Sequence, residues 1–147
     1  MNFDEFNNIV ELLKIKKPIL FDLDSDAAPT DEDINHIEKY YELEFPISYK
    51  MFLKKYGGGY FAYGLIYSID RNSSCSIESN VAKDLILNEN ILPVYDFETG
   101  DLACFRINNK RVEDNIVIYN HEYNILEELN LDFYEFLTRY ALKFSNN

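Results

Sequence analysis

The two histidines, His36 and His121, are the first candidates for acid–base chemistry, because histidine titrates closest to neutral pH. His121 follows a predicted strand and stands beside Glu122, the residue types of a general base. The sequence places no recognisable nucleophile with it. His36 lies one position off the apolar stripe of a predicted helix. Polar contact or surface exposure is therefore favoured for both, with a role in partner binding as the alternative for His121. No catalytic residue is predicted.

Acidic residues crowd the segment 22–33, where calcium binding is one interpretation. Asp22, Asp24 and Asp26 occupy positions 1, 3 and 5 of a calcium-binding loop. The turn position holds Ala27 in place of glycine, and the last position holds Asp33 in place of glutamate. A solvated acidic loop that leads into a capped helix fits this pattern better, and an acidic docking surface is a further alternative. We predict no metal site and no cofactor.

Two other motifs suggest chemistry only superficially. Asp96, Glu98 and Asp101 surround a predicted hairpin turn, and paired carboxylates can hydrolyse glycosides. No aromatic sugar platform accompanies them in the sequence, so exposed turn acids are the better interpretation. The triple glycine 57–59 follows a predicted helix and precedes a strand, whereas a phosphate-binding loop follows a strand and opens a helix. It predicts a helix end and a tight turn.

Composition narrows the class of partner. The 147 residues include 26 acids and 14 bases, a formal charge of −12, which opposes binding to nucleic acid or to anionic lipid. Apolar residues make up 47% of the chain and aromatic residues 16%, enough for a folded core. The length predicts one domain spanning residues 1–147. Such an acidic surface suits a basic protein partner.

The sequence also predicts a cytoplasmic protein. No apolar run reaches the ~18–20 residues that span a membrane. The first eighteen residues are amphipathic and contain Asp4, Glu5 and Glu11, which do not fit a signal peptide. Cys75 and Cys104 belong to no metal or redox motif, so reduced structural thiols are expected.

Hydrophobic periodicity predicts the elements. Apolar residues recur at helical spacing from Phe3 to Leu13 and from Phe133 to Phe144. A second helix is expected to begin after the N-cap Thr30, and a third to run from the N-cap Ser48 to Gly57. Ser79 is expected to cap a short helix through Leu87. Strands are predicted at 19–23, as a pair or bent strand at 60–69, and at 93–97, 102–107 and 115–120, with 108–115 as a long polar loop. Short turns require antiparallel pairing. The expected fold class is α+β, with a central, mainly antiparallel sheet and flanking helices.

Five motifs, in order, resemble one known family. They are TDEDINHIE at 30–38, FPISYKMFL at 45–53 followed by YGGG at 56–59, GDLACF at 100–105, IVIYNHE at 116–122 and FYEFL at 133–137. This order resembles the SUKH superfamily, the Smi/Knr-like proteins, over about residues 28–142. The sequence departs from the family pattern in three places: Phe45 replaces leucine, Tyr119 replaces tryptophan and Asp132 replaces serine.

The resemblance implies an α+β fold, no catalysis and a protein partner. Bacterial members are mostly immunity proteins that neutralise polymorphic toxins, often basic nucleases, and a regulatory or scaffold domain, as in eukaryotic relatives, is the alternative. We expect a cognate toxin as partner and a monomer or weak homodimer. The partner-binding candidates are turn and strand-end acids with neighbouring tyrosines: Asp70, Asp96, Glu98, Asp101, Glu122, Tyr95, Tyr119 and Tyr123. The acids of segment 22–33 rank second.

Overall fold

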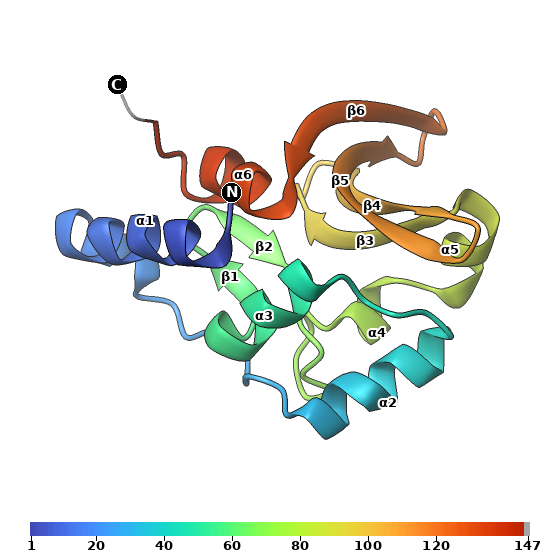
Figure 1. Cartoon of the computed structure of the whole chain (residues 1–147), viewed down its shortest axis with the longest axis horizontal. Coiled ribbons are helices and arrows are strands. Elements are labelled where there is room, and N and C mark those ends of the chain that lie inside the picture. The colour runs from blue at the N-terminus through green and yellow to red at the C-terminus, as the bar shows by residue number, and fades with distance from the viewer. Residues whose placement is uncertain (146–147) are drawn as a thin grey trace.

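A single six-stranded antiparallel sheet organises the computed structural model, which describes residues 1–145 (Figure 1). Its spatial order equals its chain order: β1 (Gly59–Phe61), β2 (Gly64–Ile66), β3 (Ile91–Asp96), β4 (Asp101–Asn108), β5 (Arg111–Asn120) and β6 (Ile125–Asp132). Every neighbouring pair runs antiparallel. The predicted α+β class is confirmed.

The helices pack beside this sheet without enclosing it, with α1, α3 and α6 close together near β1 and β2 in Figure 1. They are α1 (Phe3–Lys16), η1 (a 3-10 helix, Pro18–Phe21), α2 (Asp31–Tyr41), α3 (Ile47–Tyr56), α4 (Ile77–Asn80), α5 (Lys83–Glu89), α6 (Phe133–Phe136) and η2 (a π-helix, Leu137–Ala141). None of the helices within residues 1–145 is long and apolar enough to cross a membrane.

Some helices begin at a residue whose side chain caps the free backbone amides of the first turn. The Thr30 hydroxyl accepts a hydrogen bond from the Asp33 amide, and Asp33 accepts one from the Thr30 amide, so the predicted cap of α2 is confirmed. The predicted Ser48 cap is wrong, because the N-cap is Pro46 and α3 begins at Ile47, two residues before a Ser48 cap would start it. The predicted Ser79 cap is also wrong. Ser76 caps α4, which ends at Asn80, and Val81 has an extended backbone before α5 starts at Lys83.

The triple glycine closes α3 against the acidic loop. Gly57 has φ +79° and is the C-cap of α3, as predicted. A Cβ on Gly57 would lie 2.0 Å from the Asp26 carbonyl oxygen. Gly58 and Gly59 also have positive φ, so a side chain at either position would be strained as well.

The core lies mainly on one face of the sheet. Phe105 and Ile116 belong to it; the Phe105 ring packs against the rings of Tyr49 and Phe133, and Phe133 in turn meets Phe52. Alternate strand residues point to the other face, where a smaller cluster has Leu85 of α5 packed against it. The buried members of that cluster are Ile91, Cys104, Val117 and Tyr119.

Three predictions about the elements fail. Residues 19–23 are not a strand: most of them form η1, and the Ile19 and Leu23 side chains are exposed. The polar loop predicted at 108–115 is a tight turn, because β4 reaches Asn108 and β5 starts at Arg111. β6 was not predicted, and most of its residues are exposed.

The closing helix is shorter than predicted but buries the predicted face. Phe133, Phe136, Leu137 and Ala141 are buried, whereas Tyr140 and Phe144 are half-buried. Regular α-helix gives way to the π-helix at Leu137, which ends at Ala141.

Candidate functional site

The turn between β3 and β4 presents three carboxylates. Asp96 ends β3, Asp101 begins β4, and Glu98 lies between them with φ 60°. The Glu98 amide donates a 2.6 Å hydrogen bond to Asp96 Oδ1, and the Phe97 amide donates to the Asp101 carbonyl. These bonds fix the turn, so the acids it carries are held on a rigid sheet.

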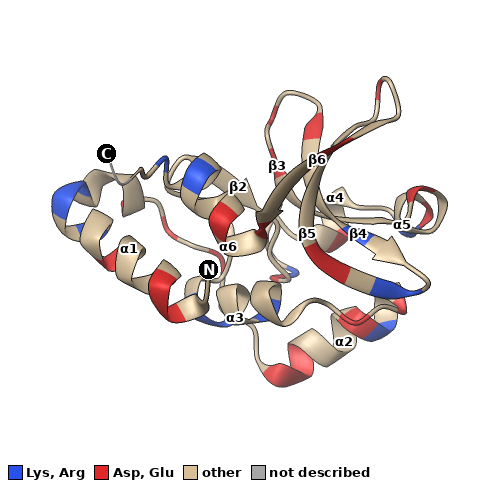
Figure 2. Cartoon of the chain, turned by 45° about the horizontal axis from the view of Figure 1, so that its top comes forward, with Lys and Arg blue, Asp and Glu red and all other residues tan. Residues whose placement is uncertain are grey.

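The turn between β5 and β6 lies beside it. Asn120 Nδ2 donates a 2.7 Å hydrogen bond to Asp101 Oδ1, and His121 Nδ1 lies 3.0 Å from the Gly100 carbonyl oxygen. His121 therefore joins two turns, which confirms its predicted polar contact. Both turns project at the top of Figure 2, where Asp and Glu are red, and Glu122 is exposed on the second one.

The β1–β2 turn completes the same end of the sheet, because β2 pairs with β3 at Asp96. Tyr60 donates a 2.8 Å hydrogen bond from its hydroxyl to Glu98 Oε1. We call this end the turn face and define it by Tyr60, Tyr63, Asp96, Glu98, Asp101, Glu122 and Tyr123. Four of the sequence-predicted acids thus come together there.

The three predicted tyrosines divide between surface and core. Tyr123 is 67% exposed, whereas Tyr95 and Tyr119 are 4% and 3% exposed. Burial raises the pKa of Tyr95 to about 12. The Tyr119 hydroxyl donates to Asn124 Oδ1, at the end of the β5–β6 turn. Tyr95 and Tyr119 therefore support the turn face from beneath.

Asp70 lies apart from the turn face, in the loop that leaves the opposite end of β2. Its carboxylate accepts hydrogen bonds from the amides of Ala27 and Asn72. It helps to hold the acidic segment, whose Asp26 accepts a 2.6 Å hydrogen bond from the Ser68 hydroxyl. Asp31 in the same segment forms an ion pair with Lys54. Several acids of segment 22–33 are thus engaged within the molecule, whereas Asp24 and Glu32 are exposed.

A pocket of about 370 Å³ opens within the turn face. We call it the tyrosine pocket; its lining consists of Tyr60, Tyr63, Gly64, Leu65, Tyr95, Asp96, Phe97, Glu98, Tyr140 and Lys143. Only Tyr95, Asp96 and Glu98 of these were predicted as site residues; the other seven, Tyr60, Tyr63, Tyr140 and Lys143 among them, were missed. The tyrosines on either side of the Phe61-Ala62 pair were the one available signal, because side chains flanking a tight turn emerge at the same end of a sheet.

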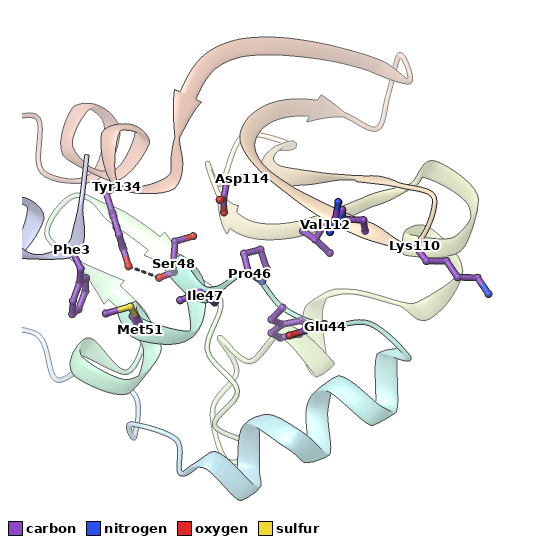
Figure 3. A pocket seen from close by; sticks show the side chains of 12 residues that line it. Phe3, Glu44, Pro46, Ile47, Ser48, Met51, Lys110, Val112, Asp114 and Tyr134 are labelled. Carbon is purple, nitrogen blue, oxygen red and sulfur yellow. Dashed lines mark hydrogen bonds between the residues drawn. The ribbon is translucent and has the colours of Figure 1, made fainter.

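A larger groove, of about 660 Å³, lies near the opposite end of β4 and β5 (Figure 3). Exposed Ile47 and Met51 border it, and the β4–β5 turn adds Lys110 and Arg111. Tyr134 donates a 2.8 Å hydrogen bond to the Ser48 carbonyl within it. Glu44 and Asp114 also line it and balance the two cations, so this groove carries no excess negative charge for a basic partner, unlike the turn face.

Residues 1–145 contain no group of three or more His, Cys, Asp or Glu side chains that could hold a metal ion. Cys75 and Cys104 are both free thiols. Burial raises the pKa of both, most strongly for the buried Cys104, so their thiolate forms are disfavoured at neutral pH.

Comparison with known proteins identifies the family. No curated protein matches the chain. The model of the SUKH_6 family, described as SMI1-KNR4 cell-wall, matches residues 31–137, from the first turn of α2 to the residue that follows α6. That span includes all six strands, and the family is known for immunity-like proteins that bind other proteins. The chain therefore belongs to the SUKH_6 family of SMI1-KNR4 proteins.

Proposed function

We propose that this protein is an immunity protein that binds a basic toxin domain, such as a nuclease, through its turn face. One observation carries the proposal: two hydrogen-bonded turns hold Asp96, Glu98, Asp101 and Glu122 side by side on a chain of charge −12. Nuclease domains are basic where they hold the phosphate backbone. An acidic inhibitor can occupy that surface and associate rapidly with it.

The protein in this proposal acts by contact and has no catalytic role. It works in the cytoplasm as a monomer or weak homodimer, within a single domain, and it needs no cofactor, nucleic acid or membrane. His121 supports the contact surface by joining the two turns. A regulatory or scaffold domain is the second candidate, which the family description, SMI1-KNR4 cell-wall, favours.

Co-expression with a toxin encoded beside this protein tests the proposal. We expect growth rescue and co-purification of the pair. The charge reversals Glu98→Lys and Glu122→Lys, made together, should weaken binding and reduce its dependence on salt. Both glutamates are exposed, and the lysines that replace them would repel a basic partner.

A matched control is the pair Asp24→Lys and Glu32→Lys, which changes the charge equally on the second acidic surface. Circular dichroism must show that both variants fold. If the turn-face pair leaves affinity and salt dependence unchanged while the control pair reduces them, segment 22–33 is the binding surface. If the toxin is active and neither the wild type nor any variant restores growth, the immunity function is contradicted.

A further inference from the structure

The tyrosine pocket combines aromatic walls with carboxylates at its rim. Five rings line it, from Tyr60, Tyr63, Tyr95, Phe97 and Tyr140. Asp96 and Glu98 supply the negative charge. A cation is attracted both to the face of an aromatic ring and to a carboxylate. The pocket therefore has the chemistry of a receptor for a positively charged side chain.

Packing beneath the pocket holds its walls in place. The Tyr95 ring lies directly on Gly64, where a Cβ would come within 2.6 Å of Tyr95 Cε2. Phe136 packs edge-on against Tyr95 at 4.9 Å between centroids and stacks on Tyr140 at 4.8 Å. Since Phe136 is fully buried, these rings keep their positions without a ligand.

Hydrogen bonds orient the two carboxylates. Tyr67 donates from its hydroxyl to Asp96 Oδ2 at 3.0 Å, and the Glu98 amide donates to Asp96 Oδ1. Tyr60 donates to Glu98 Oε1, and this bond raises the pKa of the Tyr60 hydroxyl. Among the described residues, Glu98 Oε2 has no hydrogen-bond partner within the molecule, so it can accept one from a ligand.

One cation of the chain already occupies this pocket. Lys143 Nζ lies 4.6 Å from the centroid of the Tyr63 ring. The backbone around it is anchored, since the Tyr63 amide donates to the Ala141 carbonyl and the Phe144 amide donates to the Thr138 carbonyl. The ring face of Tyr63 is thus an observed cation site, with the chain's own lysine as occupant.

We propose that the tyrosine pocket receives one arginine side chain of the protein partner, which competes with Lys143 for the ring of Tyr63. The inference rests on the proposed function, because it supplies the chemistry of one contact on the turn face. A guanidinium is planar and less hydrated than an ammonium, so it stacks on tyrosine better than lysine does. It also has several N–H donors for a carboxylate, and Glu98 lines the same pocket as Tyr63.

Titration of the whole protein with N-acetyl-arginine amide, followed by amide NMR shifts, tests this pocket without the toxin. We expect saturable shifts confined to the pocket, centred on Tyr63, Gly64 and Glu98. The citrulline analogue has nearly the same shape without the charge and should bind about two- to fivefold more weakly. Equal responses to both probes, or arginine shifts spread across all acidic turns, would overturn the proposal.

Two variants sharpen the test. Lys143→Gln removes the internal competitor and should raise the affinity for N-acetyl-arginine amide about two- to fivefold. Glu98→Gln should lower it, whereas Glu122→Gln makes the same charge change outside the pocket and should leave it nearly unchanged. An unaltered affinity in Lys143→Gln would refute the competition. Growth rescue without arginine binding would refute the pocket alone, and arginine binding without rescue would refute the immunity function alone.

Discussion

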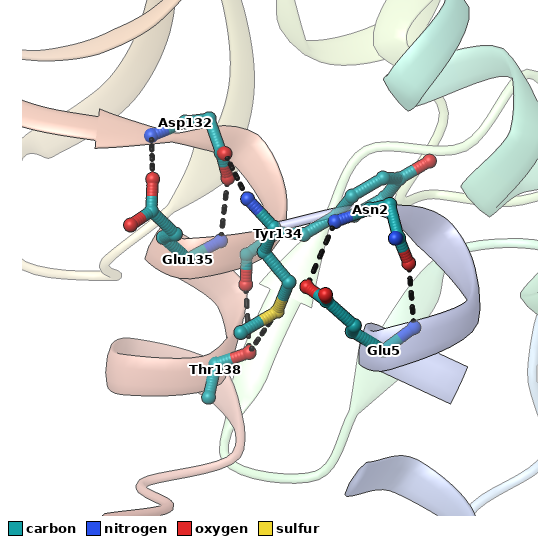
Figure 4. A network of polar contacts seen from close by, with 7 residues as sticks. Asn2, Glu5, Asp132, Tyr134, Glu135 and Thr138 are labelled. Atoms are coloured by element: carbon teal, nitrogen blue, oxygen red, sulfur yellow. Dashed lines mark hydrogen bonds and ion pairs between the residues drawn. The ribbon is translucent and has the colours of Figure 1, made fainter. Parts of the chain in front are cut away.

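The amino group of Met1 lies 2.8 Å from Oδ2 of Asp132, although 131 positions separate the two residues (Figure 4). Asp132 also caps α6, because its Oδ1 accepts a hydrogen bond from the Glu135 amide. Asn2 and Glu5 form the capping box of α1 directly after Met1. One carboxylate therefore connects Met1, directly before the N-cap of α1, to the start of α6.

Substitutions at Asp132 should separate these two roles. Asparagine is also a good N-cap, so Asp132→Asn removes the charge and keeps the cap. We expect Asp132→Ala to lower the free energy of unfolding by about 1 kcal/mol more than Asp132→Asn does. Urea denaturation of both variants measures the difference, and equal losses would show that the cap contributes nothing.

The ion pair itself should respond to alkaline pH. The hydrogen bond to Asp132 raises the pKa of the Met1 amino group above its ordinary 8.0. A group whose pKa is raised in the folded state contributes stability below its unfolded pKa and loses it as the pH rises through the folded one. The stability gap between the wild type and Asp132→Asn should therefore narrow between about pH 7 and about pH 10. A constant gap would contradict the pairing.

Phe136 should be the most sensitive position of the closing helix. Its ring is fully buried and contacts the rings of Tyr95, Phe97 and Tyr140. Phe136→Ala should lower the free energy of unfolding by roughly 3–5 kcal/mol through the cavity it leaves. Arg139→Ala, at an exposed position of the next turn, should change it by less than about 0.5 kcal/mol. A loss below about 1 kcal/mol for Phe136→Ala would show that this helix face is not buried.

Helix faces such as this one were predictable from the sequence because their apolar spacing records burial on one side. The β6 strand was not, because it lies at the sheet edge and its Glu127 and Glu128 are exposed. The acids of the turns were found through turn residues such as Gly100. The tyrosine pocket escaped because its walls come from residues 60–65, 95–98 and 140–143, which only the folded sheet brings together.

Gly57 and Gly100 offer a matched pair for backbone strain. Both have positive φ, which disfavours any side chain. A Cβ at Gly57 would also lie 2.0 Å from the Asp26 carbonyl oxygen, whereas at Gly100 the nearest heavy atom, on His121, would be 3.7 Å away. Gly100→Ala should therefore cost about 1–2 kcal/mol of folding stability, and Gly57→Ala distinctly more. Chemical denaturation of both variants measures this, and equal losses would mean that the acidic loop moves aside freely.

Buried tyrosines should make the protein sensitive to strong alkali. Burial raises the pKa of Tyr41, Tyr49, Tyr67 and Tyr134 above the ordinary value of 10.0. These hydroxyls stay neutral in the folded state and ionise first in the unfolded chain. Stability is therefore intact below about pH 10 and falls above it, by about 1.4 kcal/mol per pH unit for each such tyrosine.

Tyrosinate absorbance and urea denaturation, followed together against pH, test this expectation. Tyr41→Phe should make the alkaline decline shallower, because one buried hydroxyl is gone. A folded protein in which all 12 tyrosines titrate along one curve would argue against the assignment.

The agreement between strand order and chain order has a consequence for how the chain folds. Each strand pairs with the next one along the chain. The strands β3 to β6 can therefore pair one after another through three short turns, with little loss of chain entropy. The first helix has the opposite situation, because Phe6 stacks on Tyr134, near the other end of the sequence. During synthesis, α1 can first pack on Phe52, Tyr56 and Phe61, and its packing is completed only when α6 has emerged. We expect pulse-labelled hydrogen exchange to show the β4 and β5 amides protected first and those of α1 last.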